Sequence, residues 1–177
     1  PEQVIPKPPV APQVRPPRET GPVTLSLGVG TSTGGAGGFF QYNTKAGLAL
    51  HAGIGMYPTS FIYSDTDWVK NEMLYSVGVK YYLPFKSQYL RPYFDVQYGG
   101  FTIEAVQIIV GIWEYQYIYK NEQKALYGPT ALVGGEVRLG TLGLNLAAGV
   151  SYAATAWEWK SQDLYFSFDF SLIYTVK

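Results

Sequence analysis

His51 is the only histidine of the chain and the side chain best suited to act as a general base near neutral pH. Nucleophilic catalysis requires a serine within hydrogen-bonding reach of such a base, with an acid behind it. Ser76, Ser151 and Asp169 fall on the same predicted face as His51, but nothing local links them to it, and no His-x-Ser pair occurs. We interpret His51 as an interior hydrogen-bonding residue, and an enzyme centred on it is kept as an alternative.

Metal, phosphate and nucleic-acid sites receive little support from the composition. One histidine and no cysteine exclude multi-histidine and thiolate sites, so no metal and no cofactor is expected. The segment GTSTGGAGG at residues 30–38 lacks the Lys-Ser/Thr ending and the following helix of a phosphate-binding loop. We expect a flexible connection there. The net charge of zero gives no reason to expect nucleic acid as a partner.

Six charged residues share one face of the predicted strands. Isolated charges in a narrow interior are costly, so three basic and three acidic side chains on this face predict a paired network that fills it. A hairpin turn centred near Ser87 would place one basic and one acidic member opposite each other, namely Lys80 and Asp95. A gated pore or proton path is the functional alternative. The set consists of Lys80, Arg91, Asp95, Glu136, Arg138 and Asp169.

The elements that must position these residues are strands, because apolar residues recur at every second position in segment after segment. Connections of a few residues alternate with the long segments 58–72 and 104–125, as at the two ends of an up-and-down barrel. The longest nearly apolar run, 105–113, is too short for a membrane-spanning helix. The predicted strands are 23–30, 37–43, 47–57, 73–83, 91–103, 126–138, 143–155 and 162–176.

The last strand shows how the two faces of the sheet differ. In DLYFSFDFSLIYTV, Phe166, Phe168 and Phe170 alternate with Ser167 and Asp169. Across the strands one row carries no charge, whereas the other is mostly glycine, serine and alanine. A soluble sheet would expose many charged residues, yet charged residues make up only 15% of the chain. The sequence therefore predicts an all-β fold, an eight-stranded antiparallel up-and-down transmembrane β-barrel with lipid outside.

Two segments outside this pattern are candidates for partner binding. Residues 1–22 hold eight of the twelve prolines and predict an extended tail, separate from a barrel domain at 23–177. Alternation continues through residues 106–120, which predicts a hairpin above the membrane, and exposed aromatic rows are typical contact surfaces. Trp157 and Trp159 are expected in an aromatic girdle. The partner-binding candidates are Pro6, Pro8, Pro9, Pro12, Pro16, Pro17, Trp113, Tyr115, Tyr117 and Tyr119.

The segments YSVGVKYYLPFKSQYLRPYFDVQYG and YGPTALVGGEVRLGTLGLNLAAGVSY resemble the strand, turn, strand units of small outer-membrane β-barrel proteins of the OmpA/OmpX type. The resemblance covers residues 23–176. It implies the outer membrane of a Gram-negative-type bacterium, a periplasmic tail, and contact with membrane lipids that can include lipopolysaccharide.

We expect a non-enzymatic barrel that is a structural or accessory subunit of a larger envelope complex and contacts other envelope proteins through its tail and hairpin. Two alternatives stay open. One is a lipid-modifying barrel enzyme using His51, since small barrels that deacylate or palmitoylate lipid A use a histidine with a serine and an acid. The other is a narrow channel.

Overall fold

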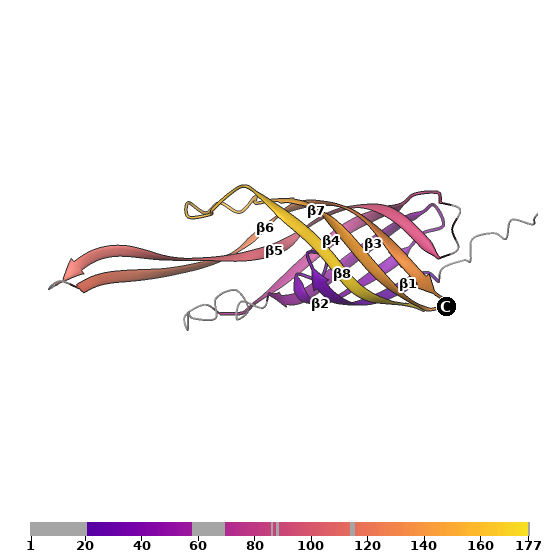
Figure 1. Ribbon diagram of the computed structural model, residues 1–177, viewed down its shortest axis with the longest axis horizontal. Coiled ribbons are helices and arrows are strands. Elements are labelled where there is room, and N and C mark those ends of the chain that lie inside the picture. The colour runs from indigo at the N-terminus through magenta and orange to yellow at the C-terminus, as the bar shows by residue number, and fades with distance from the viewer. Residues whose placement is uncertain (1–20, 58–69, 86, 88, 114–115, 177) are drawn as a thin grey trace, which may run out of the picture.

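In the computed structural model the chain forms one closed barrel of eight antiparallel strands (Figure 1). The structure describes residues 21–57, 70–85, 87, 89–113 and 116–176, without the side chains of 112–117. Each strand pairs with its neighbours in the chain, and β8 closes the barrel on β1. The strands are β1 Val23–Gly30, β2 Gly35–Asn43, β3 Leu48–Tyr57, β4 Glu72–Tyr82, β5 Leu90–Trp113, β6 Gln116–Leu139, β7 Leu142–Tyr152 and β8 Leu164–Val176.

The side chains of the barrel are arranged inside out, as the alternation predicted. Phe166 is 76% exposed, whereas Ser167, the next residue, is only 3% exposed. Neighbouring strands keep this phase, because Val150 on β7 lies opposite Phe166 and Gly149 lies opposite Ser167. The outer surface of the barrel is consequently apolar, and the small and polar side chains crowd its interior.

The apolar outer surface has the height of a bilayer core. Strand β7 rises about 33 Å between Leu142 and Tyr152 at roughly 3.3 Å per residue. At a strand tilt of about 40° this corresponds to roughly 25 Å along the barrel axis. Exposed tyrosines lie near both limits of this surface, such as Tyr75 and Tyr98 at one end and Tyr81 and Tyr174 at the other.

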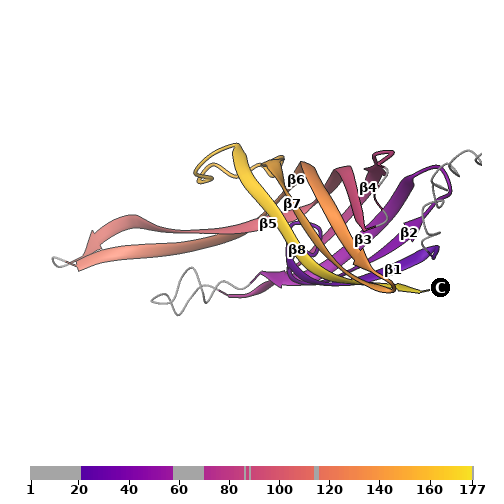
Figure 2. The same cartoon turned by 45° about the vertical axis from the view of Figure 1, so that its right-hand side comes forward.

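The two ends of the barrel differ in their connections. Short turns join β2 to β3 and β6 to β7, where Gly47 and Gly140 adopt φ values of 78° and 77° that favour glycine. Both chain ends of the barrel lie at this end, because Val23 pairs with Val176. The β7–β8 connection and the extensions of β5 and β6 lie at the opposite end (Figure 1, Figure 2).

β5 and β6 are much longer than the other strands, with 24 residues each. Register shifts at Gly100/Thr102 and Ile109/Gly111 mark irregularities in their pairing. Beyond the first shift the two strands leave the barrel as a two-stranded ribbon (Figure 2), which confirms the predicted hairpin. We define the ribbon as residues 103–113 and 116–125. No helix in the described part of the chain is long and apolar enough to cross a membrane.

Candidate functional site

Glu136 on β6 is the centre of the charged group inside the barrel. Its carboxylate accepts hydrogen bonds from Nε and Nη2 of Arg138 at 2.9 and 2.6 Å. Arg91 Nη1 lies 3.8 Å from Glu136 Oε2, and Lys80 Nζ lies 4.0 Å from Oε1. One buried acid therefore faces three cations, and the excess positive charge must be offset by the other interior acids.

Two tyrosines that the sequence analysis missed pack with these charged side chains, and together they form what we call the Glu136 layer. The Tyr82 hydroxyl donates to Glu136 Oε1 and accepts from Gln41 Nε2 at 2.8 Å. The Arg91 guanidinium lies 3.9 Å from the centre of the Tyr82 ring. Tyr93 is fully buried and donates to Asn145 Oδ1 at 2.6 Å. These rings, rather than charges alone, fill the half of the barrel nearest the chain ends.

His51 lies in the interior, and a hydrogen bond of 2.9 Å joins its Nε2 to Asp95 Oδ1. Asp95 also lies directly opposite Lys80 in the ladder, as the predicted Ser87 turn requires. No ion pair between these two is found among the described residues; instead Lys80 Nζ lies 4.6 Å from the ring centres of Phe39 and Tyr93. Both side chains of the His51 pair are wholly buried, so no substrate can approach them without rearrangement.

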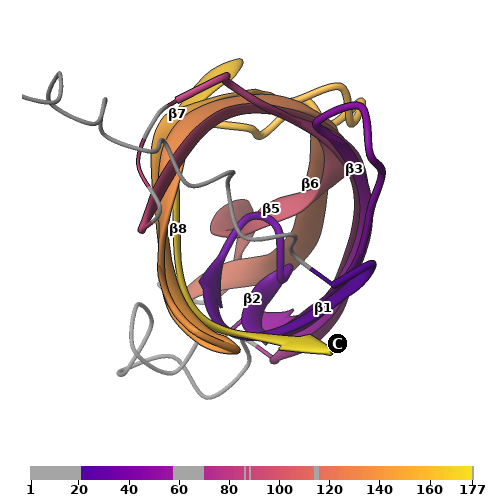
Figure 3. The ribbon, with the colours of Figure 1, turned by 90° about the vertical axis from the view of Figure 1, so that its right-hand side faces the viewer.

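Asp169 anchors a turn that folds into the barrel. It accepts hydrogen bonds from the backbone N–H of Ser32 at 2.9 Å and from the hydroxyls of Ser32 and Thr31. Ser76 donates to the Ser32 carbonyl oxygen at 2.5 Å. Residues 31–33 are buried, and Figure 3 shows the β1–β2 turn inside the ring of strands. The expected flexible connection is therefore a buried turn that plugs one end of the interior.

The base of the ribbon is held on both faces by its neighbours. Gln123 bonds both backbone groups of Lys70, at 2.8 and 2.6 Å. On the other face Glu104 accepts from Ser161 N at 3.0 Å and from Ser161 Oγ at 2.5 Å. Lys124 Nζ donates to the carbonyl of Ala156 at 3.1 Å. These contacts fix where the ribbon leaves the barrel.

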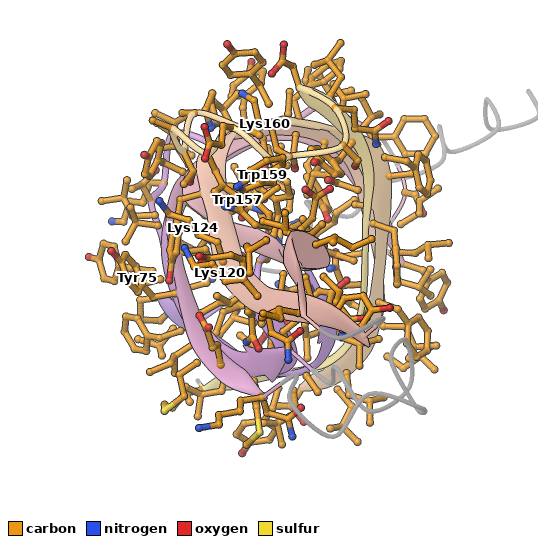
Figure 4. The ribbon with its side chains drawn as sticks, turned by 90° about the vertical axis from the view of Figure 1, so that its left-hand side faces the viewer. Tyr75, Lys120, Lys124, Trp157, Trp159 and Lys160 are labelled. Carbon is orange, nitrogen blue, oxygen red and sulfur yellow. The ribbon has the colours of Figure 1, made fainter. Side chains whose placement is uncertain are left out.

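Trp157 strengthens this attachment in a way that the girdle prediction missed. It packs against a buried cluster of Phe101, Leu126 and Ala153 at the mouth of the barrel. Figure 4, which looks along the ribbon toward the barrel, shows Trp157 and Trp159 beside Lys124. Trp159 is 45% exposed.

The outer part of the ribbon carries few charges and exposes apolar side chains. Ile109, Val110 and Ile118 are 55%, 56% and 47% exposed. Lys120 and Glu122 on β6 form an ion pair of 2.5 Å, and this hydrogen bond raises the pKa of Lys120.

The partner-binding residues proposed from the sequence are only partly visible in the structure. Tyr119 lies on β6 and is half-exposed. Trp113 and Tyr117 belong to β5 and β6, but their side chains lie outside the described residues. The remaining candidates lie wholly outside them, namely Tyr115, Pro6, Pro8, Pro9, Pro12, Pro16 and Pro17.

Among the described residues, no group of three His, Asp or Glu side chains is placed to hold a metal ion. Two features of the described structure are candidates for function, namely the packed, hydrogen-bonded interior and the projecting ribbon. The interior can hold the barrel in shape, and the ribbon can present backbone and apolar groups to another molecule.

Comparison with solved structures finds two similar chains. The chain is similar to the N-terminal β-barrel domain of Pseudomonas aeruginosa OprF, with a TM-score of 0.56 and 12% identity, over 89% of this chain and 100% of that one. Neisserial surface protein A (NspA) aligns with a TM-score of 0.41 and 13% identity, over 88% and 94% of the two chains. No protein-family profile and no curated protein sequence matches the chain. The likeness to OprF supports the fold, an eight-stranded barrel.

Proposed function

We propose that this protein is a non-enzymatic outer-membrane barrel that serves as a structural or accessory subunit of a larger envelope assembly. The observation that carries the membrane assignment is the inside-out barrel, because an uncharged outer surface about 25 Å tall is suited to lipid and unsuited to water. The barrel fold shared with the OprF domain is in accord with this location. The barrel would contact outer-membrane lipids, including lipopolysaccharide.

The proposed role in an assembly rests on the ribbon. A two-stranded hairpin is at best marginally stable in water, yet this one extends by about 30 Å beyond the barrel and has apolar side chains near its end. The ribbon gains little stability from its own two strands, so we infer that a binding partner stabilises it. We assign it, together with the proline-rich tail at the opposite end in the periplasm, to contacts with other envelope proteins.

The interior gives less support to the two alternatives. A lipid-modifying enzyme would need His51 to meet a serine and a substrate, but His51 is bonded to Asp95 and wholly buried. A channel would need an open path, whereas the Glu136 layer and the turn at 31–34 occupy the two halves of the interior. The interior groups therefore support a scaffold role.

Co-purification in mild detergent tests the proposal. The full-length protein should elute with envelope proteins at a mass well above that of one chain. A variant with residues 107–121 replaced by a two-residue Asn-Gly turn, which joins the paired residues Val106 and Glu122, should lose some or all of these proteins while keeping the folded barrel. Deleting residues 1–21 tests the tail in the same way. A full-length protein that elutes as a monomer, with neither deletion changing any association, would overturn the accessory role.

A further inference from the structure

The two long edges of the ribbon differ in how they are protected. Natural sheets guard their free edges with charged residues or proline, because an unguarded edge pairs with other chains. The β6 edge carries Lys120, Glu122 and Lys124. The β5 edge, residues 105–111 with the sequence AVQIIVG, carries no charge and no proline. Seven uncharged residues rich in β-branched side chains are typical of a segment that pairs with another strand.

The backbone of this β5 segment has one unoccupied side in the described structure. Residues 105–109 and Gly111 pair with β6, and the register shift leaves Val110 without an opposite residue. Of the strands that the structure describes, β4 pairs with β5 only as far as Gly99. The outward N–H and C=O groups of residues 105–111 therefore face away from every described strand. A hydrogen-bonding partner for these groups would stabilise the ribbon.

A lipid surface does not fit this edge. The apolar side chains of Ile109, Val110 and Ile118 would favour entry into a bilayer. Unpaired backbone groups, however, lose several kcal/mol each in hydrocarbon, and open sheet edges do not occur there. Insertion would bury both edges of the ribbon without satisfying them.

A second copy in the same membrane does not fit either. Two copies would project their ribbons in the same direction, so a two-fold axis along the membrane normal would bring the β5 edges together in parallel. A 180° rotation about an axis parallel to the strands relates the two copies. A given residue of one copy would therefore point to one face of the joint sheet, and the same residue of the other copy, at the same height, would point to the opposite face. Neighbouring strands in a ladder share their pleat, so this arrangement cannot pair. A two-fold pair of β5 edges is therefore excluded.

We propose that residues 105–111 of β5 form a docking edge for an extended, uncharged segment of another envelope protein, which adds to the ribbon as a third strand. The backbone groups supply affinity, and exposed side chains such as Ile109 and Val110 select an apolar partner segment. Three strands also form a more stable sheet than two. This inference rests on the proposed partner-binding function of the ribbon.

Photo-crosslinking in intact cells can test which edge is occupied. Gln107 on β5 and Asn121 on β6 lie directly opposite each other, so they share one height and one face and differ only in the edge. A benzophenone amino acid at position 107 should give an adduct with another protein, and the same probe at position 121 should give at least about fivefold less.

The double variant Val106→Lys/Val110→Lys should reduce the adduct from position 107 by about fivefold or more. The first of these two changes places a positive charge directly opposite Glu122, so the ribbon itself is retained. The matched control Asn121→Lys adds a charge to the guarded edge and should leave the adduct unchanged. Faster gel migration of the unheated protein verifies the folded barrel in each variant.

Several results would overturn the docking edge. They are equal adducts from both positions, an adduct with the mass of two copies of this chain, a lipid-only adduct, no adduct at position 107, or no effect of the two lysines. If the protein crosslinked from position 107 still co-purifies with the two-lysine variant after residues 1–21 are also deleted, the edge assignment fails while the accessory role stands. If replacement of residues 107–121 changes no association, the ribbon's role in the proposed function fails as well.

Discussion

Replacement of Glu136 by glutamine should be among the most destabilising single changes in the barrel. The substitution keeps the size of the side chain but leaves Arg138, Arg91 and Lys80 without their shared anion. Removing one partner of a buried ion pair typically costs about 3 to 5 kcal/mol, because the remaining charge stays out of water. The amide can still bond the Tyr82 hydroxyl, so we expect the lower part of this range, about 3 kcal/mol.

The assay is reversible urea unfolding of the protein in lipid vesicles, followed by tryptophan fluorescence. Glu158→Gln is the matched control, because Glu158 is exposed on the β7–β8 loop and its replacement should change stability by at most about 0.5 kcal/mol. Adding Arg138→Met to Glu136→Gln should restore about 1 kcal/mol or more, since one of the unpaired cations is removed. A loss below about 1 kcal/mol for Glu136→Gln would refute the central role of this carboxylate.

Three further predictions address the outer surface, the buried turn at residues 31–34 and the tyrosines of the Glu136 layer. Phe168→Arg should destabilise the barrel by about 2 to 4 kcal/mol in vesicle unfolding, because the exposed ring lies near the middle of β8; an unchanged midpoint would contradict lipid exposure. Gly53→Val should displace the turn at 31–34, because a Cβ at Gly53 would lie 1.8 Å from the Ser32 carbonyl oxygen; we expect about 2 kcal/mol of destabilisation in vesicle unfolding, and an unchanged midpoint would argue against a turn packed over Gly53. Tyr93→Phe should cost about 1 to 3 kcal/mol in the same unfolding assay by leaving Asn145 Oδ1 unbonded, and a loss below about 0.5 kcal/mol would show that this bond is dispensable.

The strands and their two faces could be predicted from the sequence because they depend on local order. The alternation of Phe166, Ser167, Phe168 and Asp169 is a property of neighbouring residues, and lipid outside the barrel imposes it on every strand. The continued alternation of β5 and β6 likewise predicted the ribbon. The register of β4 and β5 followed from one turn, which put Lys80 opposite Asp95.

The pairing of side chains across the interior could not be predicted in the same way. Asp95 lies beside Lys80 in the ladder but bonds His51 from β3, a choice that depends on how the closed barrel brings the interior side chains together. Alternation places Tyr82 on the same inward face as Lys80, but it does not show that the Tyr82 hydroxyl bonds Glu136 from β6. The tethering of Asp169 to Ser32 joins positions far apart in the sequence, and nothing in the segment GTSTGGAGG indicates it.

The buried turn at residues 31–34 limits where foreign peptides can be displayed on this barrel. An epitope inserted there would have to expel groups that are bonded to Asp169 and packed over Gly53. The β7–β8 connection exposes Glu158 and Trp159 to solvent, so a tag inserted between these two residues would displace no buried side chain of the barrel interior. Surface labelling of this protein should therefore begin at the β7–β8 connection.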